Sequence, residues 1–347
     1  MMFPSPVSLR DDPLSDPFGE RVRPAICMSR HVLGGRFRFE SDSIALLEMV
    51  EAAYGGLPAH RLPGVSPEFH IELRVVARAP GDVPEEPAPV RMQGGKGLLC
   101  GVVDAANYLV LSPAQRRALI VVSEDMLAFP YHVRYELIEF AVFLLASRVL
   151  DLVPLHGACI GRDGVGVLLL GASGAGKSTL ALQGVLDGME LLAEDSVFVH
   201  AETLLATGVA NFLHVKDDTL RFVDDTTARG WIGGSTVIRR RSGVAKYEAD
   251  LRARPASAAS APLRLAGAVF VSNKPAGDRA ELLQPVPWEL AAPMLAADQR
   301  YAAGHAGWDR FVSRITRAGI HELRRGEHPR DGIRALDRLL DRCDKPG

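Results

Sequence analysis

A glycine-rich segment holds the residues best suited to chemistry in this sequence. Residues 171 to 179 read Gly-Ala-Ser-Gly-Ala-Gly-Lys-Ser-Thr, which matches the pattern Gly-x4-Gly-Lys-[Ser/Thr] of a phosphate-binding loop. The glycines let backbone N–H groups face phosphate oxygens, Lys177 can reach the β and γ phosphates, and the Ser178 hydroxyl can ligate Mg²⁺. The pattern predicts that a nucleoside triphosphate is held by Gly171, Ser173, Gly174, Ala175, Gly176, Lys177, Ser178 and Thr179.

The flanks of this segment predict the two elements that such a loop requires. An apolar run from Val165 to Leu170 indicates a strand buried on both faces. The pair Asp163-Gly164 before it predicts a hairpin whose first strand begins near Leu155. Behind the loop, apolar residues recur at helical spacing, at Leu180, Ala181, Val185 and Leu186. We therefore expect strand, loop and helix in that order.

Three further residues are candidates for catalysis. Phosphoryl transfer needs an acid near the γ phosphate, which holds metal and orients or deprotonates the acceptor. Glu194 and Asp195 lie 17 and 18 positions after Lys177, so a parallel strand–helix–strand path can return them to the loop. His156 lies 21 positions before Lys177, on the strand whose hairpin partner leads into the loop. A solvated acidic turn and a structural histidine are the simpler interpretations of the same residues.

The same residues carry a family resemblance. The run Leu155-His156-Gly157-Ala158-Cys159, the loop, and the stretch from Glu190 to Val197 together resemble the catalytic domain of the HPr kinase/phosphorylase family. The resemblance is closest to shorter relatives encoded beside peptide-modification systems, including kinases of lasso-peptide precursors. It covers about residues 153–200 closely, the C-terminal part loosely and the N-terminal part weakly. The fold it implies is α/β, a P-loop kinase core of the HPr kinase/PEP carboxykinase type with a mixed sheet flanked by helices.

The resemblance also implies an activity and roles for the candidates. It implies transfer of the γ phosphate of ATP to a seryl hydroxyl of a peptide or protein, with ATP and Mg²⁺ as cofactors. Lys177 and Ser178 would grip phosphate and metal, and His156 would line the site. The family usually has Asp-Asp where this chain has Glu194-Asp195. We expect Glu194 to be the base and Asp195 the metal-side carboxylate, with the reverse arrangement left open.

Basic residues downstream are candidates for binding the acceptor or neutralising charge. We place Lys216 and Arg221 ahead of Arg239-Arg240-Arg241 and Lys246, most of which are expected at the surface. The segment from Gly230 to Ser235 indicates a mobile loop. The glycine-rich signature of phosphorolysis is missing after Val199, which favours a kinase over a reversible enzyme.

Composition sets limits on the class of protein. The 347 residues are 47% hydrophobic and 24% charged, and 40 basic against 42 acidic residues leave a net charge of −2. This balance argues against a nucleic-acid partner. The longest apolar stretch is too polar for a membrane span, and the cysteines are scattered without metal spacing, so we expect a cytoplasmic protein. A homo-oligomer is left open.

The order of elements along the chain predicts three regions. Residues 1–30 lack an apolar core and are expected to be disordered or extended. Residues 31–130 contain strand and helix patterns of a small N-terminal α+β domain, and residues 131–347 contain the catalytic domain. Three functions remain open: a serine kinase of a peptide or protein, a kinase of a small hydroxylated metabolite, and a non-catalytic ATP-gated binding module.

Overall fold

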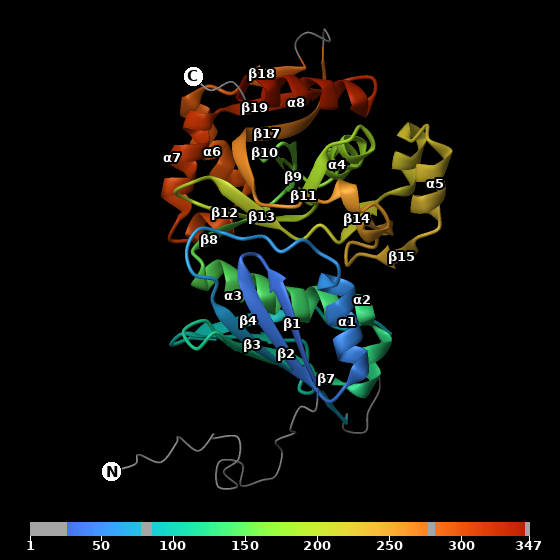
Figure 1. The fold of residues 1–347 in the computed structure, drawn as a ribbon, viewed down its shortest axis with the longest axis vertical. Coiled ribbons are helices and arrows are strands. Elements are labelled where there is room, and N and C mark those ends of the chain that lie inside the picture. Colours follow the sequence, from blue (N-terminus) through green and yellow to red (C-terminus); the bar gives the residue numbers. More distant parts are fainter. Residues whose placement is uncertain (1–25, 78–84, 277–281, 344–347) are drawn as a thin grey trace.

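The computed structural model describes residues 26–77, 85–276 and 282–343, and within them the chain forms two large β-sheets and a small third one (Figure 1). The predicted disordered terminus therefore lies largely outside the described residues, and Ile26 already begins a strand. The expected α/β class, with a mixed sheet flanked by helices, is confirmed, because such a sheet carries the glycine-rich loop. The predicted domain boundaries stay a prediction.

The first sheet is built from the N-terminal strands, of which Glu68–Val76 and Tyr108–Ser112 alternate more and less buried residues along much of their length. Its order is β1 (Ile26–Val32), β2 (Gly35–Ser41), β3 (Glu68–Val76), β7 (Arg117–Ser123), β6 (Tyr108–Ser112), β5 (Leu98–Val102) and β4 (Arg91–Gly95). Helix α1 (Ile44–Tyr54) connects the parallel strands β2 and β3, and the Ser43 side chain caps it by accepting from Leu46 N. This agrees with the predicted strand and helix patterns of the region.

A long helical segment follows the short 3₁₀ turn η2 (Glu124–Ala128) and packs on this sheet. It consists of α2 (Pro130–His132), a π-helical stretch η3 (Val133–Glu139) and α3 (Phe140–Val149). Its apolar residues share one core with the first sheet and with Phe198 and Leu152 of the second sheet. In Figure 1, α3 lies between the two large sheets. The segment therefore joins the first sheet to the part of the chain that carries the loop.

The second sheet holds the loop and is covered by helices on both faces. Its order is β11 (Glu190–Ala193), β9 (Ala158–Arg162), β10 (Val165–Leu170), β17 (Leu263–Pro275), β13 (Leu205–Gly208), β12 (Ser196–His200) and β8 (Leu152–His156). In addition, β19 (Ile320–Arg325) pairs with β17, and β18 (Leu283–Pro285) pairs with β19. Strand β10 is buried along its length, as predicted. Val167 and Leu169 face the core that contains α4 (Lys177–Leu186) and α8 (Pro329–Cys343). Leu168 and Leu170 face α6 (Trp288–Asp298) and α7 (Trp308–Ala318).

The third sheet packs beside α4 and contains two of the basic candidates, Arg239 and Lys246. Strands β14 (Phe212–Val215), β16 (Ala245–Asp250) and β15 (Thr236–Arg239) form it, in that order. Short helical turns surround these strands and the end of the second sheet: η4 (Asp217–Phe222), η5 (Leu251–Ala253), η6 (Pro255–Ser257) and η8 (Ala302–Gly304). The predicted mobile loop from Gly230 to Ser235 is wrong: its first four residues belong to the end of helix α5 (Thr226–Gly233), which buries Ala228 and Ile232.

The structure bears on two features considered in the composition, namely apolar helices and cysteines. None of the helices in the described part of the chain combines the length and apolar character that a bilayer crossing needs. Cys27, Cys100 and Cys159 are free thiols.

Candidate functional site

The glycine-rich loop joins the end of β10 to the start of α4, as predicted. Gly171, Gly174 and Gly176 have φ angles of 123°, 83° and 107°, in the region that favours glycine. A Cβ on Gly171 would lie 2.8 Å from the carbonyl oxygen of Val271, so the close approach of β17 also requires a glycine. The N-cap of α4 is Gly176, and no side chain of the described residues caps it. Its backbone N–H groups are therefore available to an anion.

Lys177 is the first residue of α4, and its side chain folds back over the glycine-rich loop. Its Nζ donates hydrogen bonds to the carbonyl oxygens of Gly171 and Ala172. Burial lowers the pKa of Lys177, and the carboxylates of Asp298, Asp195 and Glu194 oppose that shift. Asp298, at the end of α6, is an acidic neighbour of Lys177 that the sequence did not indicate.

The first acid of the pair, Glu194, is buried beside the loop. The Ser178 hydroxyl donates to its Oε1, and Nδ1 of His214 on β14 lies 2.9 Å from its Oε2. Nζ of Lys246 lies 4.0 Å from Oε1. Burial would raise the pKa of Glu194, but the hydrogen bond and charge of His214, the charge of Lys246 and the bond from Ser178 hold it well below its usual range. Glu194 is thus an ionised carboxylate next to the hydroxyl predicted to ligate metal.

The second acid, Asp195, has different neighbours. Its Oδ1 lies 3.4 Å from Nδ1 of His156, and its Oδ2 accepts from Nη1 of Arg240 at 3.1 Å. The side chains of Asp195 and His156 are 43% and 61% exposed. The two adjacent acids therefore contact different parts of the site: Glu194 contacts Ser178 of the loop, and the more exposed Asp195 contacts His156.

His156 reaches this place from a strand other than the one expected. It ends β8, which pairs with β12, whereas the hairpin into the loop is formed by β9 and β10. The predicted hairpin at Asp163-Gly164 is confirmed, but the placement of His156 in it is wrong, because Gly157 separates β8 from β9. Gly157 N donates to the carbonyl oxygen of Asp195 at 3.1 Å, which holds the histidine and the acid together.

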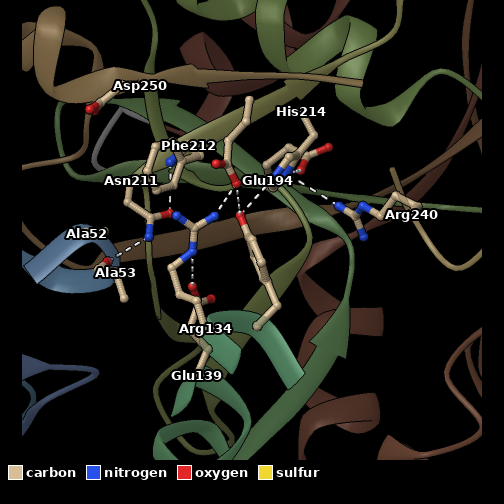
Figure 2. A network of polar contacts seen from close by, with 12 residues as sticks. Ala52, Ala53, Arg134, Glu139, Glu194, Asn211, Phe212, His214, Arg240 and Asp250 are labelled. Atoms are coloured by element: carbon tan, nitrogen blue, oxygen red, sulfur yellow. Dashed lines mark hydrogen bonds and ion pairs between the residues drawn. The ribbon is translucent and has the colours of Figure 1, made fainter. Parts of the chain in front are cut away.

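One cavity brings most of the predicted residues together. Its lining includes loop residues and candidates of the sequence analysis, namely Ser173, Gly174, Gly176, Lys177, Ser178, Thr179, His156, Glu194, Asp195 and Lys216. It also includes His214, Arg240, Ser242 and Lys246, of which His214 and Ser242 had no sequence signal and Arg240 stood in a basic triplet expected mostly at the surface. Figure 2 shows Arg240 pointing toward His214 and Glu194. We call this the acidic-pair cavity.

A second cavity opens on the other side of the loop and continues the first. Gly174, Gly176, Thr179, Asp218 and Thr219 line both cavities. The remaining lining of the second cavity includes Ala175, Phe222, Asn273 and the residues from Arg324 to His328. Arg221, a predicted substrate residue, lies here and not in the acidic-pair cavity, with its guanidinium 4.6 Å from the centre of the Phe222 ring. We call this the Phe222 cavity.

Comparison with known proteins finds relatives for a limited part of the chain. No protein-family model matches it. An HPr kinase/phosphorylase of Listeria welshimeri is 38% identical over 74 residues, which are 20% of this chain and 24% of that protein. Those of Geobacter sulfurreducens and Limosilactobacillus reuteri are 47% and 40% identical over 55 and 76 residues, or 16% and 21% of this chain and 17% and 24% of theirs.

A solved structure gives a weaker likeness. The Hpr(Ser) kinase/phosphatase of Coxiella burnetii is 13% identical, with a TM-score of 0.28, over 55% of this chain and 88% of that one. At that score the likeness supports no conclusion about the fold. The sequence matches span about a quarter or less of the length of the curated relatives. Over about a fifth of its length, therefore, the chain is related to the HPr kinase/phosphorylases.

Proposed function

We propose that the chain is an ATP-dependent kinase that transfers the γ-phosphoryl group to a seryl hydroxyl of a peptide or protein. The observation that carries this proposal is that the phosphate loop, a carboxylate bonded to its serine, and a second carboxylate paired with a histidine line one cavity. Phosphoryl transfer depends mostly on positioning and charge stabilisation, and these are the parts that it uses.

The residues beside Ser178 fit a magnesium ion. Ser178 Oγ and Glu194 Oε1 are adjacent oxygen atoms, the ligand type that Mg²⁺ prefers. Mg²⁺ commonly binds through one or two carboxylates together with substrate phosphates. When bound, it would neutralise charge on the phosphate oxygens. The depressed pKa of Glu194 suits a metal ligand better than a base, so we assign Glu194 to the metal side.

The exposed acid is then assigned to the acceptor. Asp195 accepts the proton of the seryl hydroxyl while the serine oxygen bonds to the γ phosphorus, and the bond to the oxygen bridging the β and γ phosphorus atoms breaks to leave ADP. His156 and Arg240, which contact opposite oxygens of Asp195, fix the orientation of that carboxylate. This reverses the assignment preferred from sequence and adopts the arrangement that was left open there.

The two cavities suggest how ATP lies across the loop. The acidic-pair cavity would take the β and γ phosphates, because it contains Lys177 and Ser178. The Phe222 cavity would take the nucleoside, since it shares the loop glycines and offers an aromatic ring and the Asn273 amide. In this arrangement Arg221 serves the nucleotide and Lys216 stays a candidate on the phosphate and acceptor side.

A transfer assay tests the proposal. Purified protein with Mg²⁺ and γ-labelled ATP should label a serine of the acceptor, and Lys177→Ala should abolish the label. Following the family resemblance, the first acceptor to test is a ribosomally synthesised precursor peptide of the lasso type, with its serine-to-alanine variant as control. Labelling that survives in Lys177→Ala would refute the mechanism. If Asp195→Asn still binds ATP and keeps the function of the wild-type protein in the cell, the non-catalytic ATP-gated binding module is favoured instead.

A further inference from the structure

A buried polar network extends from Glu194 and His214, which line the acidic-pair cavity, to Glu248, Tyr135 and Arg134, which line neither cavity. Nδ1 of His214 contacts Glu194, and its Nε2 lies 2.7 Å from Oη of Tyr135 and 3.4 Å from Oε1 of Glu248. Arg134 forms an ion pair with the same Glu248 oxygen. We define the buried polar network as Glu194, His214, Glu248, Tyr135 and Arg134.

The network crosses from one part of the fold to another. Glu194 follows β11 of the second sheet, His214 and Glu248 face each other on β14 and β16 of the third, and Tyr135 and Arg134 belong to η3. The helical segment that contains η3 shares its core with the first sheet. Figure 2 shows Arg134 reaching upward from this segment toward the strands that carry His214. Tyr135, in the helical segment packed on the first sheet, is thus linked to the Glu194 carboxylate through a single intervening residue, His214.

The far end of the network is fixed by several contacts at once. Oη of Tyr135 donates a hydrogen bond to Oε1 of Glu248 at 3.1 Å, and the same oxygen forms the ion pair with Arg134. The Arg134 guanidinium also lies 4.5 Å from the centre of the Phe212 ring. Arg134 and Glu248 side chains are only about a tenth exposed, at 10% and 9%. Breaking one such contact leaves buried charge without its partner, which makes the arrangement strongly preferred over alternatives.

The backbone of η3 suits this role. It is a π-helical stretch within a longer helix, a distortion that is often found at functional sites. It presents the consecutive residues Arg134 and Tyr135 to the same carboxylate of β16 while Val133, Leu137 and Ile138 remain in the core. The helix is therefore anchored on one side by apolar packing and on the other by the buried polar network.

We propose that Tyr135 and Arg134 are positioning residues for Glu194, whose orientation they set through His214 and Glu248. This inference rests on the proposed function, and in particular on the metal-side role of Glu194. Residues that hold a ligating side chain in place commonly change metal affinity by about 10- to 100-fold when they are altered. The helical segment packed on the first sheet would then help to hold Glu194 in the orientation that binds the metal and ATP.

The test compares Tyr135 with Tyr54, a buried tyrosine of the core that also contains Val133, Leu137 and Ile138 of η3. Tyr135→Phe removes the hydroxyl that contacts His214 and Glu248, and keeps the ring. Tyr54→Phe is the matched control, because Tyr54 is buried and its hydroxyl has no hydrogen-bond partner among the residues described. The full chain is titrated with ATP by calorimetry, with and without Mg²⁺. We expect the gain in ATP affinity due to Mg²⁺ to fall by about 10-fold in Tyr135→Phe and to stay unchanged in Tyr54→Phe.

A double substitution separates positioning from general loosening. In the Glu194→Gln background, Tyr135→Phe should cause no further loss, because its effect passes through Glu194. Glu248→Gln is the second variant and should reproduce the loss seen with Tyr135→Phe, while ATP affinity without Mg²⁺ stays within about 2-fold in Tyr135→Phe and Glu248→Gln. An unchanged Mg²⁺ gain in Tyr135→Phe, or an equal loss in the Glu194→Gln background, would overturn the inference.

This experiment is independent of phosphoryl transfer. If wild-type protein binds ATP with Mg²⁺ and the variants behave as expected, the inference holds even when no acceptor is labelled, and only the proposed kinase activity fails. If Glu194→Gln does not change the Mg²⁺ gain, the metal-side role fails and the inference fails with it, although transfer can still be observed.

Discussion

The side chain of Gln299 brackets the backbone of His156. Its Oε1 accepts from His156 N at 2.7 Å, and its Nε2 donates to the carbonyl oxygen of His156 at 2.8 Å. Gln299 follows α6 and is buried, whereas the His156 side chain is exposed to the acidic-pair cavity. The last residue of β8 is therefore held from the side opposite to Asp195 and cannot turn away from it without losing both bonds.

We predict that Gln299→Ala lowers the rate of phosphoryl transfer by about 10-fold and leaves the KM for ATP nearly unchanged, because Gln299 holds His156, His156 orients Asp195, and a small displacement of the base is costly. The matched control is Gln183→Ala, a buried glutamine of α4 that bonds to Asp187 and lines neither cavity. Steady-state kinetics with ATP and the acceptor measures both constants. A rise in the KM for ATP with an unchanged kcat would contradict the proposed role of His156 in orienting Asp195.

Glu194 and Asp195 are expected to fail in different ways. Glu194→Gln removes the charge beside Ser178, so the Mg²⁺ concentration for half-maximal rate should rise by about 10-fold or more. Asp195→Asn removes the proton acceptor, so kcat should fall by about 100-fold with the Mg²⁺ requirement unchanged. Measuring the rate against Mg²⁺ concentration for both variants decides the assignment. The opposite pattern would restore the arrangement first preferred from sequence.

Glu139 links the buried polar network to the pH dependence of stability. Burial raises its pKa to about 8, and the neighbouring charges that act on it come from Arg134, His214, Glu248 and Asp195. An unfolded glutamate has a pKa of about 4.3, so the folded chain binds this proton more tightly. The contribution of Glu139 to stability is therefore full below about pH 4.3 and is lost as the pH rises toward 8.

Glu139→Gln keeps the shape of the side chain and removes its titration. At pH 8 the free energy of unfolding of the variant should exceed that of the wild type by at least about 1 kcal/mol, and the difference should shrink toward pH 5. Urea denaturation at pH 5, 6.5 and 8 measures it. The difference between the two proteins cancels the titration of groups that both retain. A difference that is constant over this range would contradict the raised pKa.

Short-range patterns were enough to predict the loop and its flanks. Strand β10, helix α4 and strand β11 follow from apolar spacing, and the 17 positions from Lys177 to Glu194 match one helix and one strand. The two acids meet the loop because β10 and β11 run in the same direction on either side of β9.

The remainder of the site has no such local signal. His214 and Lys246 lie on short strands in which buried and exposed residues do not alternate regularly. Arg240 belongs to a run of three arginines, a pattern typical of the protein surface. Gln299 contacts His156 across 143 residues of sequence. A single side chain whose partner is so distant leaves no periodic pattern, because its place depends on how α6 packs on the second sheet.

The Phe222 cavity provides a final prediction about the nucleoside. Stacking of a base on an aromatic side chain is worth about 1–3 kcal/mol when measured by alanine substitution. Phe222 lies next to loop residues in this cavity, with His328 at the edge of its ring and Arg221 over its face. Phe222→Ala should therefore weaken ATP binding by about 5-fold or more.

Inorganic tripolyphosphate separates the nucleoside from the phosphates in this test. It has the charges of the ATP chain and no base, so its affinity should be the same for wild-type protein and for Phe222→Ala. Tyr301→Ala is the matched control, since Tyr301 is a fully exposed aromatic residue that lines neither cavity. Equal losses for ATP and tripolyphosphate would mean that Phe222 supports the loop itself. The nucleoside would then have to lie elsewhere, because only a base-specific loss identifies the ring as its partner.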